Sequence, residues 1–211
     1  MRTGRPRSFS TDTALASAMD VFWRKGYEGA SLADLTEAMG INPPSLYAAF
    51  GNKEGLFRAA LARYEDDRKI FLDRVLAART AREVAELFLN GVADMASGNS
   101  GHPPGCLLVQ SALTCSDARI PKELARLRAT KEAALCGRFE RARKEGDLPR
   151  DAEPAALARY VMAVANGMCV QASAGAGVKE LREVALVAIA GWPADRVEKI
   201  RKVPRERQAV H

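Results

Sequence analysis

The sequence is poor in the residues on which many enzymes and metal sites depend. Only two histidines occur in its 211 residues, His102 and His211, and its four cysteines form no Cys-x-x-Cys pair. The clustered Cys and His ligands of a structural zinc site are therefore absent. No plausible Ser/His/Asp set and no Gly-rich phosphate loop is present either. We expect neither an enzyme nor a bound metal or cofactor.

Long apolar stretches are also missing, because charged residues interrupt them well before the length of a membrane span. Residues 1–7 are basic, but no apolar segment of a secretion signal follows them. The expectation is a cytoplasmic protein with reduced cysteines and no membrane partner.

The strand-like alternation of apolar and polar residues is rare, and residues that favour helices dominate. The predicted fold class is therefore all-α. The formal net charge is +6, but residues 1–60 hold seven Lys or Arg against six Asp or Glu. Net charge alone is thus weak evidence for nucleic-acid binding, and the placement of individual basic residues must carry that argument.

Apolar periodicity and capping residues predict a series of helices. The first begins near Ser10 and ends at Gly26. Gly, Ser and Pro mark a long loop over residues 97–105. The other long predicted helices cover residues 53–76, 81–96, 106–115, 121–145, 154–174 and 179–190.

Two short predicted helices near the N-terminus are separated by a tight turn. Ser31 caps the first in a capping box with Asp34, and Gly40 ends it. Asn42 and Pro43 begin the second. This pattern is typical of a helix-turn-helix, which binds DNA in many proteins and is a plain packing element in others.

Residues 10–60 resemble the TetR family of regulators. The most specific match is Leu-Tyr-x-x-Phe-x-x-Lys-Glu-x-Leu-Phe over residues 46–57. The resemblance implies a helix-turn-helix domain over residues 1–52, with a basic arm at 1–9. A helical ligand-binding and dimerisation domain would cover 53–192, followed by a basic tail at 193–211. It also implies a homodimer that binds palindromic double-stranded operator DNA and is released by a small-molecule inducer.

The second short helix would lie in the major groove, where its small side chains allow close approach. Ser45 would contact a base, Pro44 and Ala48 would meet thymine methyl groups, and Tyr47 and Lys53 would bind phosphate. For Tyr47 the alternative is a core residue, and for Lys53 a solvated one. The predicted DNA-contacting residues are Ser31, Pro43, Pro44, Ser45, Tyr47, Ala48 and Lys53. Two departures from the family pattern are Ala30, where many members have Thr, and the Pro43-Pro44 pair.

The resemblance implies that the last two long helices pair with their copies in the dimer. Small residues at 155, 156, 163, 165, 167 and 172 would allow close approach, and Leu181, Val184, Ala188 and Ile189 form an apolar stripe. Packing within one chain is the alternative for these residues.

A ligand pocket is implied between the middle helices, although no charge cluster identifies the ligand. The candidate lining residues are Phe88, Met95, Leu108, Ser111, Leu135, Phe139, Met162, Asn166 and Cys169, with Asn166 and Ser111 as polar anchors. Apolar residues of this kind more often form the core.

Cys106 follows Pro-Gly at a predicted helix start, a position that stabilises a thiolate. Cys106 is therefore a candidate sensor of electrophiles or oxidants, and the alternative is an unreactive cysteine. Two further alternatives for the whole chain are an architectural DNA-binding protein without a ligand and a helical interaction module that no longer binds DNA.

Overall fold

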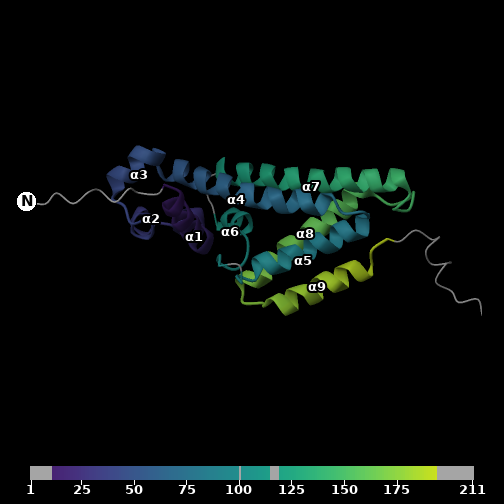
Figure 1. Ribbon diagram of the computed structural model, residues 1–211. Coiled ribbons are helices and arrows are strands. Elements are labelled where there is room, and N and C mark those ends of the chain that lie inside the picture. Colours follow the sequence, from purple (N-terminus) through teal and green to yellow (C-terminus); the bar gives the residue numbers. More distant parts are fainter. Residues whose placement is uncertain (1–10, 100, 115–118, 194–211) are drawn as a thin grey trace, which may run out of the picture.

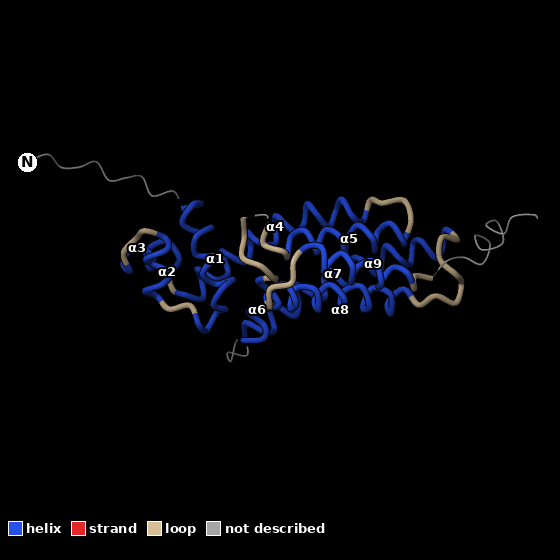
Figure 2. The backbone as a smooth tube through the Cα atoms, turned by 90° about the horizontal axis from the view of Figure 1, so that it is seen from below, coloured by secondary structure: helices blue, strands red, loops and turns tan. Residues whose placement is uncertain are grey.

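A computed structural model describes residues 11–99, 101–114 and 119–193, and every regular element in this part of the chain is a helix. The molecule is elongated: α1, α2 and α3 form one end, α4 and α7 run along its length, and α5, α8 and α9 form the other end (Figure 1). The view from below shows the same division, with α6 between the two ends (Figure 2). The all-α prediction is confirmed. The basic arm at residues 1–9 and the tail from residue 194 lie outside the described residues.

The N-terminal helices follow the predicted order and capping signals. They are α1 (Thr11–Gly29), α2 (Leu32–Met39), α3 (Pro43–Phe50) and α4 (Lys53–Leu76). The backbone of Gly26 is not helical, with φ 71° and ψ 175°, so the regular part of α1 ends where the sequence predicts. Residues 27–29 form a short helical segment beyond this kink, and Ala30 joins it to Ser31.

The remaining helices also lie close to their predicted ranges. They are α5 (Ala81–Ala96), α6 (Leu107–Thr114), α7 (Arg119–Glu145), α8 (Pro154–Ser173) and α9 (Val178–Ala190). α7 packs on α8, α5 packs on both α8 and α9, and α1 packs on α2, α4 and α6.

Buried apolar side chains form two cores, one at each end of the molecule. The N-terminal core contains Phe22 and Trp23 of α1, Leu35 of α2, Leu46 of α3 and Phe57 of α4, among other residues. It is completed from later in the chain by Leu107, Leu108, Ile120 and Leu124. The C-terminal core is built mainly from α5, α7, α8 and α9. The N-terminal core therefore depends on α6 and α7 as well as on the first four helices.

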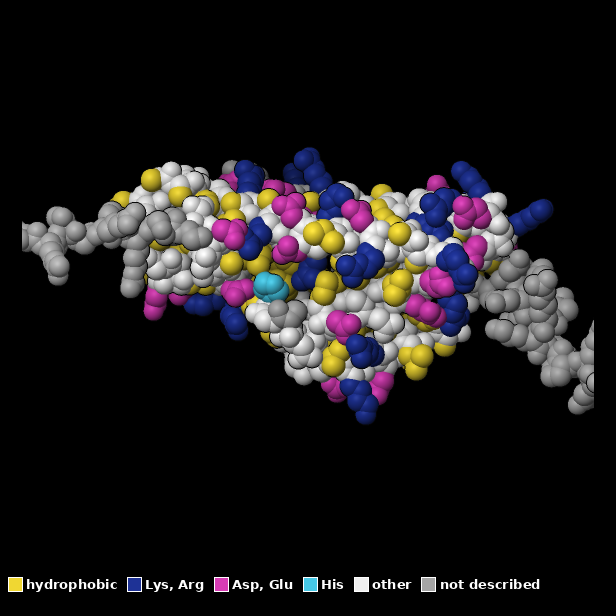
Figure 3. Space-filling view, viewed as in Figure 1, with side chains coloured by type: hydrophobic (Ala, Val, Ile, Leu, Met, Phe, Trp, Pro, Cys, Tyr) yellow, Lys and Arg dark blue, Asp and Glu magenta, His cyan; other side chains and the backbone are white. Residues whose placement is uncertain are grey.

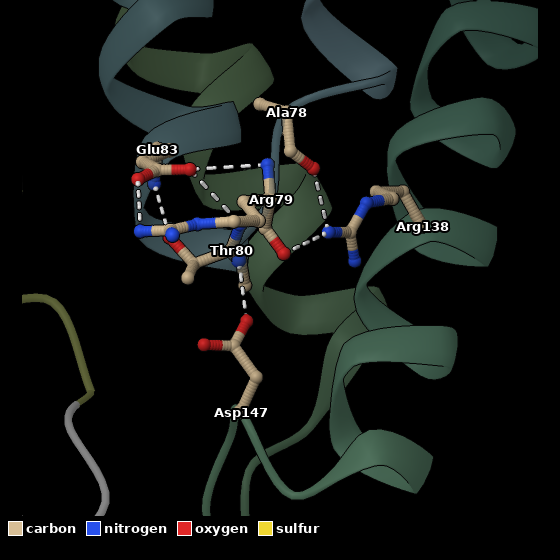
Figure 4. A network of polar contacts seen from close by, with 7 residues as sticks. Ala78, Arg79, Thr80, Glu83, Arg138 and Asp147 are labelled. Atoms are coloured by element: carbon tan, nitrogen blue, oxygen red, sulfur yellow. Dashed lines mark hydrogen bonds and ion pairs between the residues drawn. The ribbon is translucent and has the colours of Figure 1, made fainter.

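A buried arginine fixes the turn between α4 and α5 (Figure 4). Arg138 of α7 is 5% exposed and donates hydrogen bonds to the carbonyl oxygens of Ala78, at 2.8 Å, and Arg79, at 2.9 Å. On the other side of the turn, the Glu83 carboxylate accepts from the backbone nitrogens of Arg79 and Thr80. The end of α4, which extends from α3 into the C-terminal core, is thereby held against α7.

None of the helices in the described ranges combines the length and the apolar character that crossing a membrane would require.

Candidate functional site

The start of α2 is fixed by a reciprocal cap and an ion pair. Ser31 Oγ accepts a hydrogen bond from the backbone nitrogen of Asp34 at 3.1 Å, and Asp34 Oδ2 accepts from the backbone nitrogen of Ser31 at 3.0 Å. Asp34 also pairs with Lys25 at the end of α1, at 2.7 Å. The hydrogen bond from Lys25, followed by those from Ser31, lowers the pKa of Asp34 to about 2. The predicted capping box is confirmed, and it links α1 to α2.

The turn and the start of α3 also follow local sequence signals. Gly40 has φ 65° and ψ 31°, a left-handed conformation that glycine adopts without steric cost. The side chain of Asn42 then caps α3 by accepting from the backbone nitrogen of Ser45 at 2.9 Å, and Pro43 occupies the first turn. The buried Leu46 anchors α3 in the N-terminal core.

The opposite side of α3 is exposed and consists of small or polar side chains. We call this set the outer face of α3: Pro43, Pro44, Ser45, Tyr47 and Ala48. Tyr47 is 46% exposed and so is not a core tyrosine. A helix with so little side-chain bulk can approach another surface closely.

Lys53 lies in the first turn of α4, where the helix dipole disfavours a cation. Its Nζ donates to the carbonyl oxygen of Glu28 at 3.3 Å and lies 4.8 Å from the centre of the Tyr27 ring. These contacts place the ammonium group beside the last residues of α1, beyond the kink at Gly26, and offset part of the unfavourable dipole interaction. Lys53 is therefore neither a fully solvated side chain nor one whose position requires a bound phosphate.

Basic side chains do not gather at the α3 end on the face shown in Figure 3. Lys and Arg side chains lie among acidic ones along the rest of the molecule, and the α3 end is mostly apolar or uncharged. This agrees with the small charge excess of residues 1–60. The basic residues Arg2, Arg5 and Arg7 fall outside the described part of the chain.

A cavity of about 80 Å³ lies between α4, α5, α6, α7 and α8. Most of its wall is apolar. The predicted ligand-binding residues that line it are Phe88, Met95, Leu108, Met162, Asn166 and Cys169, together with Cys106.

Three predicted lining residues lie elsewhere. Leu135 and Phe139 are on the same face of α7 as the cavity residues Arg128 and Lys131, but one to three turns further along, where they are packed in the C-terminal core. Helical spacing predicted the face of α7 that lines the cavity, but not the position of the cavity along the helix. Ser111 is fully buried and is not among the residues that line this cavity.

The sequence interpretation included Asn166 but missed the other polar residues of the cavity wall, which are Tyr64, Arg68, Arg128 and Lys131. One signal was available, because Arg68 continues the apolar stripe of Phe57, Leu61 and Tyr64 on α4. A charged residue on a buried stripe indicates either a functional site or an unusual contact. Arg128 and Lys131 resemble ordinary surface residues until the partner helices are placed.

Cys106 directly precedes α6, as predicted, and its carbonyl oxygen accepts from the backbone nitrogen of Gln110 at 2.9 Å. Its Sγ lies 3.2 Å from the hydroxyl oxygen of Tyr64. Hydrogen bonding from the Cys169 thiol, then from Tyr64, lowers the pKa of Cys106 against the opposing effect of burial. The same interaction and burial raise the pKa of Cys169. The neighbouring positive charge of Lys131 also favours a Cys106 thiolate.

α8 and α9 turn only part of the predicted set outward: the small residues at 155, 156, 163 and 167 on α8 are exposed, as predicted. Leu181, Ala188 and Ile189 are buried in the C-terminal core, as are Ala165 and Ala172, and Val184 packs against it. These residues, unlike the exposed predicted ones on α8, follow the alternative of packing within one chain. The exposed residues form what we call the outer face of α8 and α9: Ala156, Tyr160, Ala163, Gly167, Val170, Leu186 and Val187.

The geometry defines the chain as a helix-turn-helix protein with a separate helical body that contains a cavity. In the described residues no three His, Cys, Asp or Glu side chains are arranged to hold a metal ion.

Comparison with known proteins identifies the family. Residues 14–60 match the family described as "Bacterial regulatory proteins, tetR family". The chain is 34% identical over 198 residues to the HTH-type transcriptional repressor ComR of Escherichia coli, covering 90% of this chain and 92% of ComR.

Solved structures agree over most of the length. A cysteine mutant of the TetR family regulator CifR, solved with 26-base-pair operator DNA, is 43% identical with a TM-score of 0.84, covering 90% of this chain and 100% of that chain. A TetR-type regulator from Rhodococcus sp. RHA1 is 42% identical with a TM-score of 0.61, covering 86% and 98% of the two chains. The chain belongs to the TetR family of DNA-binding transcriptional regulators, and its relatives are regulators and not enzymes.

Proposed function

We propose that this chain is a homodimeric repressor that binds palindromic operator DNA through α3 and releases it when a small molecule occupies the cavity. The observation that carries the proposal is the outer face of α3, where a short helix is held by caps at its start and by Leu46 beneath it. ComR is named a repressor, and CifR was solved with operator DNA, which supports the same role here. Ser45 and Ala48 would face bases, and Ser31, Tyr47 and Lys53 would contact phosphates.

The outer face of α8 and α9 supports dimer formation. Leu186 is 71% exposed and Val187 74% exposed, although both are strongly apolar. On α8, the small residues Ala163 and Gly167 would let a second helix approach closely. Pairing of this face with its own copy would bury the apolar surface and place the two α3 helices in one assembly. Two related α3 helices can read two half-sites of a palindrome.

The cavity has a direct structural connection to the DNA-binding end. Cys106 lies on the cavity wall, and the next residues, Leu107 and Leu108, are buried in the N-terminal core. α6 in turn packs against α1. The cavity is also smaller than the roughly 150 Å³ that holds a benzene ring, so a larger ligand must move its walls. Such a movement would shift α4 or α6 and change the spacing of the two α3 helices, with a typical coupling of about 1–3 kcal/mol.

The first experiment tests DNA binding. Duplexes selected by the purified protein from random DNA should contain a palindrome, and a mobility-shift assay should measure their affinity. An Ala48→Glu variant places a carboxylate on the outer face of α3 and should abolish binding. The matched control is Ala129→Glu at an exposed position of α7, which should bind normally. A protein that selects no common sequence would support an architectural role, and one that binds no DNA would support an interaction module.

The second experiment tests ligand release. Candidate metabolites that raise the unfolding temperature should be added to the complex with the selected duplex. At least one should release the DNA from the natural chain. A Met162→Trp variant, which fills part of the cavity, should still bind DNA but no longer respond. A variant that responds as before would place the inducer site outside this cavity.

One observation favours a second candidate function, in which Cys106 senses electrophiles. The hydroxyl group of Tyr64 is 3.2 Å from Cys106 Sγ, and the lowered pKa of this thiol favours its nucleophilic form. N-ethylmaleimide should then release the operator from the natural chain but not from Cys106→Ser. Equal release from both proteins would exclude this role for Cys106.

A further inference from the structure

The polar groups of the cavity wall are unbalanced in charge. Among the lining residues there are three cationic side chains, Arg68, Arg128 and Lys131, and no Asp or Glu. The rest of the wall is mainly apolar, from residues such as Phe71, Phe88 and Leu72, which come from α4 and α5. A cation beside an apolar cavity is poorly solvated unless an anion accompanies it.

The known contacts of these side chains leave positive charge uncompensated. Lys131 pairs with Glu65 outside the cavity at 2.8 Å. Within the described residues, neither Arg68 nor Arg128 makes an ion pair with a carboxylate. If Cys106 were ionised, its thiolate would balance one of these two arginines, and one positive charge would still remain.

Arg68 is held in place without a carboxylate. Its guanidinium carbon lies 4.8 Å from the centre of the Tyr64 ring and 5.8 Å from that of Trp23, and it also contacts the sulfur of Met95. Asp67 lines the neighbouring cavity on the other side of Arg68 but forms no ion pair with it. The guanidinium is therefore held mainly by contact with these two aromatic rings, which leaves N–H groups at its edge for a ligand.

We infer that the natural inducer is an apolar molecule with a carboxylate group, which binds Arg68 while its apolar part lies among Phe71, Phe88 and Val92. This inference rests on the proposed function of the cavity and names its ligand class. A carboxylate matches the planar fork of arginine in shape and charge. The amide of Asn166, on the cavity wall of α8, can donate a further hydrogen bond to it.

The same contact gives a route to the DNA-binding end. Trp23 belongs to α1 and is buried in the N-terminal core, and Tyr64 belongs to α4. A carboxylate that draws Arg68 towards the cavity would weaken its contacts with these two rings. Binding at Arg68 would then change the packing between α1 and α4, the two helices that position α2 and α3.

The test compares acids with their own neutral amides. Benzoate, phenylacetate, hexanoate and octanoate, each paired with its primary amide, are titrated into the full-length protein by calorimetry. At least one acid should bind about tenfold tighter than its amide, because only the acid offers a charged acceptor. This preference should fall to about twofold or less in Arg68→Met.

Two controls keep the result interpretable. Arg74→Met changes an exposed arginine of the same helix, outside the cavity, and should keep the full preference. Arg68→Lys retains the charge and should keep part of it. If Arg68→Met does not fold, Arg128→Met takes its place and should reduce the preference. The inference is overturned if no acid binds better than its amide, or if the preference survives in the charge-removing variants.

The outcome also separates this inference from the proposed function, because calorimetry needs no DNA. An acid that binds through Arg68 but leaves the operator complex intact supports the ligand class and contradicts ligand-controlled release. Release by neutral metabolites alone, with no acid preference, supports the proposed function and overturns the ligand class.

Discussion

The outer face of α3 and the outer face of α8 and α9 are both exposed, but they are built from different chemistry. α3 presents two prolines, a serine, an alanine and the hydroxyl of Tyr47. α8 and α9 present apolar side chains, with Leu186 and Val187 among the most exposed hydrophobic residues of the described chain. A polar groove suits the first face, and a second apolar surface suits the other. Although both faces are exposed, their different chemistry points to different partners.

The largest expected effect comes from charging the apolar face. Leu186→Glu combined with Val187→Glu should give a folded monomer, because both side chains are exposed and contribute little to the core. Since one α3 helix reads only half a palindrome, operator affinity should fall by about a thousandfold or more, towards non-specific binding. Sedimentation measures the oligomeric state and mobility shift the affinity. Ile70→Glu, at a similarly exposed position of α4, should change neither. If the double variant remains dimeric, the interface lies elsewhere.

A smaller effect is expected beside the outer face of α3, at the start of α4. Lys53→Ala should weaken binding several-fold for every DNA sequence, because a phosphate contact carries no base information. The slope of log affinity against log salt concentration should become shallower by about 1. Lys69→Ala, an exposed lysine further along α4, serves as the control, and thermal unfolding reports on the lost contacts with Tyr27 and Glu28. A loss confined to one base position would contradict a phosphate contact.

On the outer face of α3, Ser45→Ala should alter specificity more than overall affinity. Loss of one hydroxyl contact should reduce discrimination at one base position by about 1 kcal/mol. Repeating the DNA selection with the variant measures this change directly. An unchanged preferred sequence would mean that Ser45 does not contact a base.

The smallest effect concerns how the cap at the start of α2 contributes to stability at acidic pH. The pKa of Asp34 is lowered from an ordinary value of 3.8 to about 2 by Lys25 and Ser31. The ionised group therefore stabilises the fold above pH 3.8, and this contribution is lost as the pH falls through about 2. NMR titration should give the low pKa, and Asp34→Asn should remove the corresponding pH dependence of unfolding. A normal pKa for Asp34 would show that the Lys25 contact does not persist in solution.

The two faces also show what the sequence could predict. The caps at Ser31 and Asn42 and the turn at Gly40 depend on residues three or four positions apart, so local reasoning located them. α9 is apolar on two sides, and the predicted stripe at Leu181, Ala188 and Ile189 is the inner one. Which side meets α5 is decided by partners distant in the sequence, so periodicity alone could not choose between them. The DNA-contacting roles and the domain limits remain predictions.

The cavity illustrates the same limit. Periodicity assigned Leu135 and Phe139 to the correct face of α7 but could not show where along the helix the cavity ends. Arg128 and Lys131 become cavity residues only because α4 and α8 lie beside them. Arg68 could have been predicted as a cavity residue, because a charged side chain at helical spacing from the buried Phe57, Leu61 and Tyr64 is unusual.

The hydrophobic core of the N-terminal end includes residues that are synthesised well after its own helices. Leu107, Leu108, Ile120 and Leu124 complete the packing around Phe22 and Trp23. During synthesis, the DNA-binding end therefore cannot close its hydrophobic core until residue 124 has left the ribosome. A nascent chain that has emerged only as far as α4 would expose apolar surface, so this end of the protein should mature together with its regulatory body and not before it.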